Sequence, residues 1–230
     1  MGTEVRKPLF VGIGHKKQQG KDTVAMTILE ALGIAGIGAV VAPFAGPLKM
    51  LASSCYGLSL EQCWGSEEEK NTMTNINNNS FSLYSGSDEG HDCLTARELL
   101  QNLGTTLRSV CPGIFTKAPF RKEWGSDIKV VLIPDLRFKD EAQMLLDNGG
   151  MLIRVVRDDE HTDTHSSEVD LDGWNKWTAT IFNNGTKEDL QVVSAKIAAR
   201  LAAGEPLHDD PDVEKIYRAS EHHVSPIEQL

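Results

Sequence analysis

The chain has 230 residues with 33 acidic and 23 basic side chains, which give it a net charge of −10. This acidic balance disfavours broad nucleic-acid binding, and no apolar stretch reaches the roughly 20 residues that a membrane span requires. The four cysteines lack metal-ligand spacing and are too sparse for a disulfide framework, so we expect free thiols. The sequence thus predicts a cytoplasmic protein with small-molecule ligands and no nucleic-acid or membrane partner, and it leaves a homodimer open.

The N-terminal region predicts a buried strand, a loop and a helix. The apolar run from Leu9 to Ile13 suits a strand that is covered on both faces, and apolar residues at helical spacing begin after Lys21. The loop between them, residues 14–20, therefore leads into a helix N-terminus, where backbone N–H groups and the helix dipole favour anions. The pattern is that of a phosphate-binding loop, with Gly20 and Lys21 at its centre.

This loop departs from the usual G-x-x-x-x-G-K-[ST] pattern at two positions. His15 occupies the place of the first glycine, so either the loop is one residue longer and Gly14 makes the turn, or His15 tolerates the backbone angle. Asp22 replaces the hydroxyl residue that meets Mg²⁺, so either Asp22 or Thr23 serves the metal. We expect Lys21 to be an exposed cation that reaches the outer phosphates of a nucleotide. The residues predicted to contact these phosphates are Gly14, His15, Lys16, Lys17, Gly20, Lys21, Asp22 and Thr23.

The next segment predicts a strand over residues 36–42 and a helix that opens at Pro47. Lys49 lies in the first turn of this helix, where the dipole disfavours a cation unless an anion is near. It is therefore either a phosphate ligand or a solvated surface lysine. Residues 65–93 are rich in Asn, Ser, Gly and acidic side chains and predict an irregular excursion.

A capping box between Thr95 and Glu98 predicts the start of another helix. Arg97 and Gln101 lie on its polar faces, which by themselves indicate a solvated helix surface. We expect a break near Gly104 that lets the backbone approach a ligand.

Charged side chains follow two later strands. The strand over residues 128–133 precedes Asp135 and Arg137, and the strand over residues 151–156 precedes Arg157. In open α/β sheets ligands bind outside the carboxyl ends of the strands, so we expect Asp135 and Arg137 to share a cleft with the phosphate-binding loop. Arginine at a strand end is also common on protein surfaces, so this pattern alone does not assign a site.

The remaining residues predict a lid-like loop over 157–175, a strand over 178–182 and a helix over 186–201. Residues 205–230 form a tail, read as a short helix or a partly disordered segment. Strands and helices alternate five times in the domain spanning residues 1–204. This predicts an α/β, three-layer αβα P-loop NTPase fold with about five parallel strands and helices on both faces.

Several motifs together resemble the bacteriophage deoxynucleoside monophosphate kinases, within the P-loop nucleoside monophosphate kinase group. The matching segments are 20–23 (GKDT), 44–49 (FAGPLK), 97–105 (RELLQNLGT), 134–137 (PDLR) with Glu141, 155–157 (VVR), and 163–165 (DTH) with Ser167 and Glu168. Their shared order makes the resemblance more specific than the phosphate-binding loop alone.

The resemblance implies phosphorylation of deoxynucleoside monophosphates to diphosphates by ATP with Mg²⁺, in the host cytoplasm if the protein is phage-encoded. It implies catalytic roles for Lys21, Arg137, Arg157 and Asp135, with Asp22 and Thr23 at the metal. The residues implied around the monophosphate are Lys49, Arg97, Gln101, Gly104, Thr105, Asp135, Arg137 and Glu141. Two alternatives stay open: another small-molecule P-loop kinase, of the nucleoside or dephospho-coenzyme A type, and an ATP-binding switch module.

Overall fold

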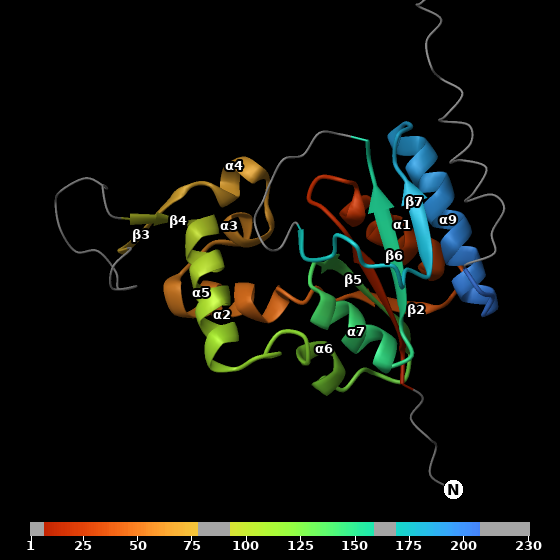
Figure 1. Ribbon diagram of the computed structural model, residues 1–230, viewed down its shortest axis with the longest axis horizontal. Coiled ribbons are helices and arrows are strands. Elements are labelled where there is room, and N and C mark those ends of the chain that lie inside the picture. Colours follow the sequence, from red (N-terminus) through yellow and green to blue (C-terminus); the bar gives the residue numbers. More distant parts are fainter. Residues whose placement is uncertain (1–6, 78–92, 159–168, 208–230) are drawn as a thin grey trace, which may run out of the picture. The chain divides into compact units, whose positions relative to one another are not determined.

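The computed structural model describes residues 7–77, 93–158 and 169–207 (Figure 1). The chain divides into two compact units, of which unit 1 comprises Met1–Pro43 with Lys122–Leu230 and unit 2 comprises Phe44–Arg121. Most of the predicted lid-like loop and tail, and the DTH and Ser-Glu motifs of the resemblance, lie outside the described residues.

Unit 1 contains a sheet of five parallel strands (Figure 1). The strands are β1 (Leu9–Gly14), β2 (Gly38–Val41), β5 (Ile128–Leu136), β6 (Met151–Val156) and β7 (Ala179–Phe182), in the order β2-β5-β1-β6-β7. Each corresponds to a predicted strand, so the predicted fold class is confirmed. Strand β1 is central, and the chain crosses to opposite sides of it, so its carboxyl end is the switch point where open α/β sheets bind ligands.

Helices cover both faces of this sheet. Helices α1 (Lys21–Ile34) and α9 (Lys187–Ala203) pack on one face, where Val11 and Ile153 belong to the same buried cluster as their apolar side chains. Helix α7 (Lys139–Asp147) packs on the other face. Successive residues of a strand point to opposite faces, so β1 serves both layers. The result is the predicted three-layer αβα arrangement.

Strand β5 is longer than the sequence analysis predicted. We expected it to end at Ile133, but it continues to Leu136 through an irregularity in its pairing with β1. Gly12 pairs with Ile133, whereas Gly14 pairs with Leu136. A proline lacks the N–H that a regular ladder needs, so Pro134 fits at such an irregular position.

Unit 2 is mostly helical with a small antiparallel sheet. Its elements are α2 (Gly46–Tyr56), α3 (Leu60–Trp64), α4 (Glu67–Lys70), β3 (Met73–Asn77), β4 (Cys93–Thr95), α5 (Ala96–Val110) and α6 (Ala118–Arg121). Regular structure thus occupies part of the segment that we expected to be irregular. Ser66 and Glu69 form a capping box that starts α4, and Ile76 of β3 is fully buried.

Helix α5 begins at the predicted capping box of Thr95 and Glu98. The break expected near Gly104 is wrong, because α5 continues without interruption to Val110. A Cβ atom at Gly104 would lie 3.2 Å from Leu48 Cδ2, so the glycine permits close packing of α5 on α2. Its physical role in the fold is this helix–helix contact.

The four cysteines are free thiols, as predicted. In the described parts of the chain, none of the helices combines the length and the apolar character needed to cross a bilayer.

Substitution of Gly12 by alanine tests how closely α7 packs on the sheet. A Cβ atom at Gly12 would lie 2.5 Å from Leu145 Cδ1, so Gly12→Ala should reduce the free energy of unfolding by about 1–3 kcal/mol. Gly33→Ala is the matched control, because this exposed helical glycine has no neighbour within 4 Å of the added atom. It should instead stabilise the protein by about 0.5–1 kcal/mol. Urea denaturation measures both, and equal effects would contradict the close packing.

Candidate active site

The loop that joins β1 to α1 has an unusual backbone. His15 and Gln18 have positive φ angles of 102° and 60°, and Gly20 has 92°. Of the two alternatives for His15, the structure supports the second, since His15 itself adopts the angle expected of the glycine. Gly20 has no room for a side chain, because a Cβ atom would lie 2.7 Å from Asn183 Nδ2. Asn183 also donates a hydrogen bond to the carbonyl oxygen of Gln19 at 3.1 Å, which fixes the loop.

The His15 side chain is buried, with 7% of its surface exposed. Its Nδ1 atom lies 3.0 Å from Gln19 Oε1, and its Nε2 atom lies 3.2 Å from Arg154 Nη2. Burial lowers the pKa of His15, the hydrogen bond with Gln19 opposes this, and the positive charges of Arg154 and Lys16 lower the pKa further. A neutral imidazole with its proton on Nδ1 satisfies both contacts, donating to Gln19 and accepting from Arg154.

Asp172 lies beside the same loop. Its carboxylate oxygens lie 3.6 Å from His15 Nε2 and 3.6 Å from Lys16 Nζ. Lys17, the other lysine of the loop, is half-buried. The loop therefore carries several positively charged side chains. One of them, Lys16, is paired with the carboxylate of Asp172, which is partly exposed.

Lys21, the first residue of α1, is buried with 7% of its surface exposed. Our expectation of an exposed cation is therefore wrong, because the loop wraps around the side chain and the Lys16 carbonyl oxygen accepts a hydrogen bond from Nζ. Burial, followed by the charge of Arg137, lowers the pKa of Lys21 to about 7, against the effect of Asp22 and Asp135. An incoming anion would favour the charged form of this side chain.

Asp135 and Arg137 both act electrostatically on Lys21, so the structure brings the end of β5 to the phosphate-binding loop. Both side chains are half-buried. Glu141 is almost fully buried, and its Oε2 atom accepts hydrogen bonds from the backbone N–H groups of Arg137 at 3.0 Å and Phe138 at 3.1 Å. Through these bonds Glu141 fixes the backbone that carries Arg137.

Two oxygen-bearing side chains lie in the first turn of α1. Asp22 is exposed and Thr23 is half-buried. Carboxylate and hydroxyl oxygens are ligands that suit Mg²⁺, and both Asp22 and Asp135 lie near enough to raise the pKa of Lys21. The donor set of this site therefore fits a magnesium ion.

Two arginines are associated with β6. Arg157, predicted from its position after the strand, is exposed. Arg154 lies within the strand, opposite Gly14 of β1, and contacts His15. Arg154 was not among the residues predicted from the sequence, because it lies inside an apolar run, although a charged residue within such a run is itself a signal. Asn183 and Asp172 were missed as well, because neither follows a motif.

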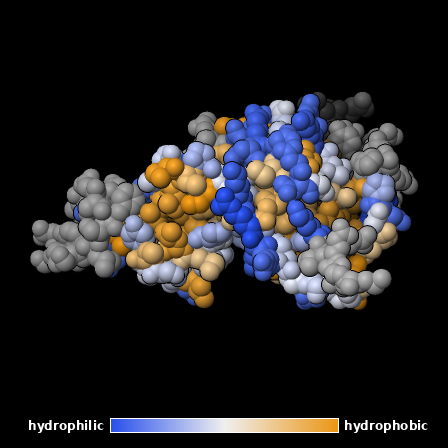
Figure 2. All heavy atoms as spheres, turned by 90° about the horizontal axis from the view of Figure 1, so that it is seen from below, coloured by the Kyte–Doolittle hydropathy of each residue, from blue (hydrophilic) through white to orange (hydrophobic). Residues whose placement is uncertain are grey.

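Unit 2 carries the other predicted side chains. Lys49 is half-buried, and its Nζ atom lies 5.5 Å from the centre of the Trp64 ring. Arg97 donates hydrogen bonds to Glu67 Oε2 at 2.7 Å and to Asn71 Oδ1 at 3.0 Å. The remaining residues predicted here lie on α5, where Gln101 and Thr105 are exposed and Gly104 is buried. Apolar side chains also gather on the surface of unit 2 (Figure 2).

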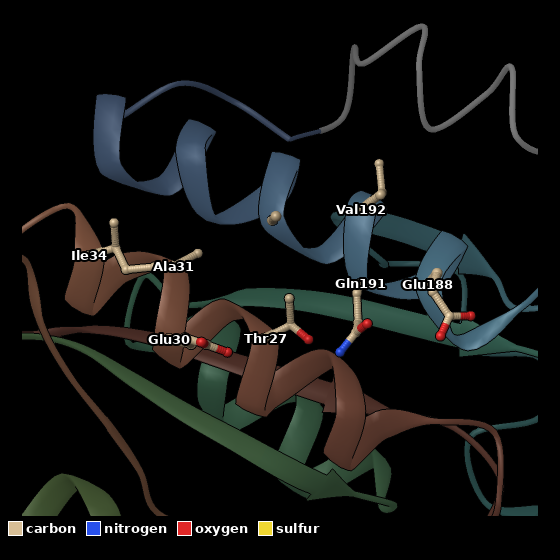
Figure 3. A pocket seen from close by; sticks show the side chains of 8 residues that line it. Thr27, Glu30, Ala31, Ile34, Glu188, Gln191 and Val192 are labelled. Atoms are coloured by element: carbon tan, nitrogen blue, oxygen red, sulfur yellow. The ribbon is translucent and has the colours of Figure 1, made fainter.

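A surface groove of about 410 Å³ lies between α1 and α9 (Figure 3). Its lining is mainly apolar, and its acidic members are Glu30 and Glu188. None of the residues predicted to bind nucleotide or metal lines it. The groove lacks the cations that phosphate groups require, so the candidate active site is the loop after β1.

Comparisons with known proteins identify the family of the chain. A family model described as deoxynucleotide monophosphate kinase matches residues 50–193. A protein of Acanthamoeba polyphaga mimivirus, named "Putative deoxynucleotide monophosphate kinase", is 31% identical over 204 residues, which cover 81% of this chain and 95% of that protein. The family model thus spans more than half of the chain, and the relative matches most of it. The chain therefore belongs to the deoxynucleotide monophosphate kinase family.

Proposed function

We propose that this kinase transfers the γ-phosphoryl group of ATP to a deoxynucleoside monophosphate with the help of Mg²⁺, using the loop after β1 for the donor. One observation carries the proposal. Lys21 is buried at the start of α1, within a loop at the carboxyl end of the central strand, and Asp135 and Arg137 act on its charge. A buried lysine with a pKa lowered to about 7 is prepared for an anion that restores its charge.

The chemistry requires positioning and charge compensation rather than a strong base. An oxygen of the acceptor phosphate is already an anionic nucleophile, so it forms a bond to the γ-phosphorus while the bond from that phosphorus to ADP breaks. Lys21, Arg137 and Arg157 supply positive charge for the phosphoryl group in transfer, and Asp135 completes the proposed catalytic set. Cations aimed at a transferring phosphoryl group contribute roughly 10³ to 10⁵ in rate in arginine-finger enzymes.

The residues proposed for the ATP phosphates are those of the loop and the start of α1, namely Gly14, His15, Lys16, Lys17, Gly20, Lys21, Asp22 and Thr23. Asp22 and Thr23 would hold the magnesium ion, since their oxygen atoms suit it. When bound, Mg²⁺ neutralises negative charge on the β- and γ-phosphate oxygens.

The acceptor monophosphate is proposed to bind the residues that the resemblance implies for it. These are Lys49, Arg97, Gln101, Gly104, Thr105, Asp135, Arg137 and Glu141. The hydrogen bonds of Arg97 Nε to Asn71 and of Arg97 Nη2 to Glu67 orient its guanidinium group, and the remaining N–H groups are proposed to donate to phosphate oxygens. The contribution of Glu141 is indirect, through the backbone of Arg137.

Family membership favours this reaction over the other kinases and the ATP-binding switch considered from the sequence. The cytoplasmic location, a bacteriophage origin and the homodimer stay predictions.

A turnover assay tests the proposed function. ATP, Mg²⁺ and a panel of deoxynucleoside monophosphates should give ADP and a deoxynucleoside diphosphate in equal amounts, with little ADP formed when the acceptor is omitted. Lys21→Met should lower kcat at least ~100-fold, because it removes a cation from the transferring phosphoryl group. Lys187→Met is the matched control, since Lys187 is likewise the first residue of a long helix but is exposed. ADP formation unaffected by every acceptor would favour the switch instead.

Arg137→Lys separates the acceptor site from the donor site. The substitution keeps the charge but removes the planar fork that holds two phosphate oxygens, so KM for the monophosphate should rise about tenfold. The affinity for a non-hydrolysable ATP analogue, titrated without acceptor, should stay near that of the unsubstituted protein. Arg121→Lys, at an exposed position at the end of α6, is the control. A loss of ATP affinity with unchanged monophosphate affinity would mean that Arg137 serves the donor.

Nucleotide binding should depend on pH through Lys21. Its pKa is about 7 without ligand, and a bound triphosphate should raise it toward the ordinary value of 10.5. Between these two values binding takes up a proton, so affinity should fall with rising pH, by up to about tenfold per pH unit. Below pH 7 Lys21 is charged in both states and contributes no such dependence.

Calorimetry at about pH 8.5, in buffers of different ionisation enthalpy, counts the protons taken up. Uptake should approach one proton per ATP analogue bound and should disappear in Lys21→Met. Uptake that persists in this variant would assign the proton to another group.

A further inference from the structure

Arg154 is a charged side chain that no part of the proposed function uses. It lies in β6 opposite Gly14, between Ile153 and Val155, both of which are buried in the core with α1 and α9. Arg154 therefore points to the other face of the sheet, where it meets the His15 ring. Within the described residues its buried Nε atom has no hydrogen-bond partner, and its Nη2 atom contacts the His15 ring rather than a carboxylate.

A half-buried arginine in such surroundings requires a negative charge from elsewhere. Among the described residues, the carboxylate of Asp172 lies 3.6 Å from His15 Nε2 and 3.6 Å from Lys16 Nζ. Placing a cation out of water without a partner is costly, and proteins rarely do so away from a ligand site. Arg154 lies opposite Gly14, the residue at which the phosphate-binding loop begins. A phosphate group bound by that loop would therefore be a suitable partner for its charge.

We propose that Arg154 binds the triphosphate of the donor nucleotide and that His15 is the positioning residue that orients its guanidinium group. This inference rests on the proposed function, because it assigns the donor to the loop after β1. Arg154 would donate hydrogen bonds to phosphate oxygens from the nitrogens that His15 does not occupy, which adds a cation to the donor side beside Lys21.

The backbone of His15 supports this role. A positive φ of 102° disfavours a side chain and is the reason that phosphate-binding loops have glycine at this position. Here a histidine is retained, and its ring is fixed by Gln19 on one side and by Arg154 on the other. The contact of the imidazole with Arg154 thus offsets the backbone strain at His15 and holds Arg154 in one orientation.

The first test removes the charge. Arg154→Met keeps the length of the side chain, and it should weaken binding of a non-hydrolysable ATP analogue at least about tenfold, the loss typical of a charged hydrogen bond. Monophosphate affinity should change less than about twofold. Arg154→Lys should restore only part of the ATP affinity, because lysine lacks the fork. Lys129→Met, which removes an exposed cation near the other end of β5, is the charge control.

The second test restores the usual glycine. His15→Gly should leave the thermal midpoint unchanged or raised, since it relieves the backbone, and yet lower kcat/KM for ATP about threefold to tenfold. Combined with Arg154→Met it should add nothing further, because His15 acts through Arg154. Gln18→Gly, at the other positive-φ side chain of the loop, calibrates how much a glycine alone changes stability.

Three outcomes would overturn the inference. These are ATP-analogue binding that is unchanged in Arg154→Met, a His15→Gly enzyme at least as active as the unsubstituted one, and additive losses in the double variant. Each is read against an unsubstituted protein that phosphorylates a deoxynucleoside monophosphate. Absence of that basal activity would instead contradict the proposed function, so the two failures are distinguishable.

Discussion

The burial of the Lys21 ammonium group is the constraint on which the candidate site depends. A cation that leaves water loses hydration, and here burial and Arg137 lower its pKa to about 7. The fold keeps the group in place through the hydrogen bond to the Lys16 carbonyl and the charges of Asp22 and Asp135. An anion that entered this loop would favour the charged form of Lys21, which is the basis for proposing phosphate binding here.

The loop around Lys21 holds a strained backbone by means of its neighbours. Positive φ angles at non-glycine residues cost on the order of 1–3 kcal/mol each, and they persist only where packing determines them. At His15 the ring contacts with Gln19 and Arg154 supply this support, and at Gly20 the adjacent Asn183 leaves no room for any other residue. The strained backbone and the candidate binding residues therefore belong to the same loop.

The candidate residues are divided between the two units. The loop after β1 and the end of β5 belong to unit 1, whereas Lys49 and Arg97 belong to unit 2. Each group is fixed by its own contacts, such as the bonds of Glu141 to the backbone of Arg137 and of Glu67 to Arg97. A reaction between two anions requires that each be held separately before their charges are brought together.

Local periodicity and capping were enough to predict the five strands, the starts of α1, α5 and α9, and the loop that joins β1 to α1. The position of Asp135 and Arg137 near this loop was also predictable, since the carboxyl end of a buried strand lies at the ligand-binding edge of the sheet. The folded structure was needed to show that Lys21 is buried, that α5 passes unbroken through Gly104, and that Arg154 meets His15. Burial and such contacts join residues far apart in the chain, so they depend on the pairing of β1 with β6 and on helix packing, which a local pattern does not contain.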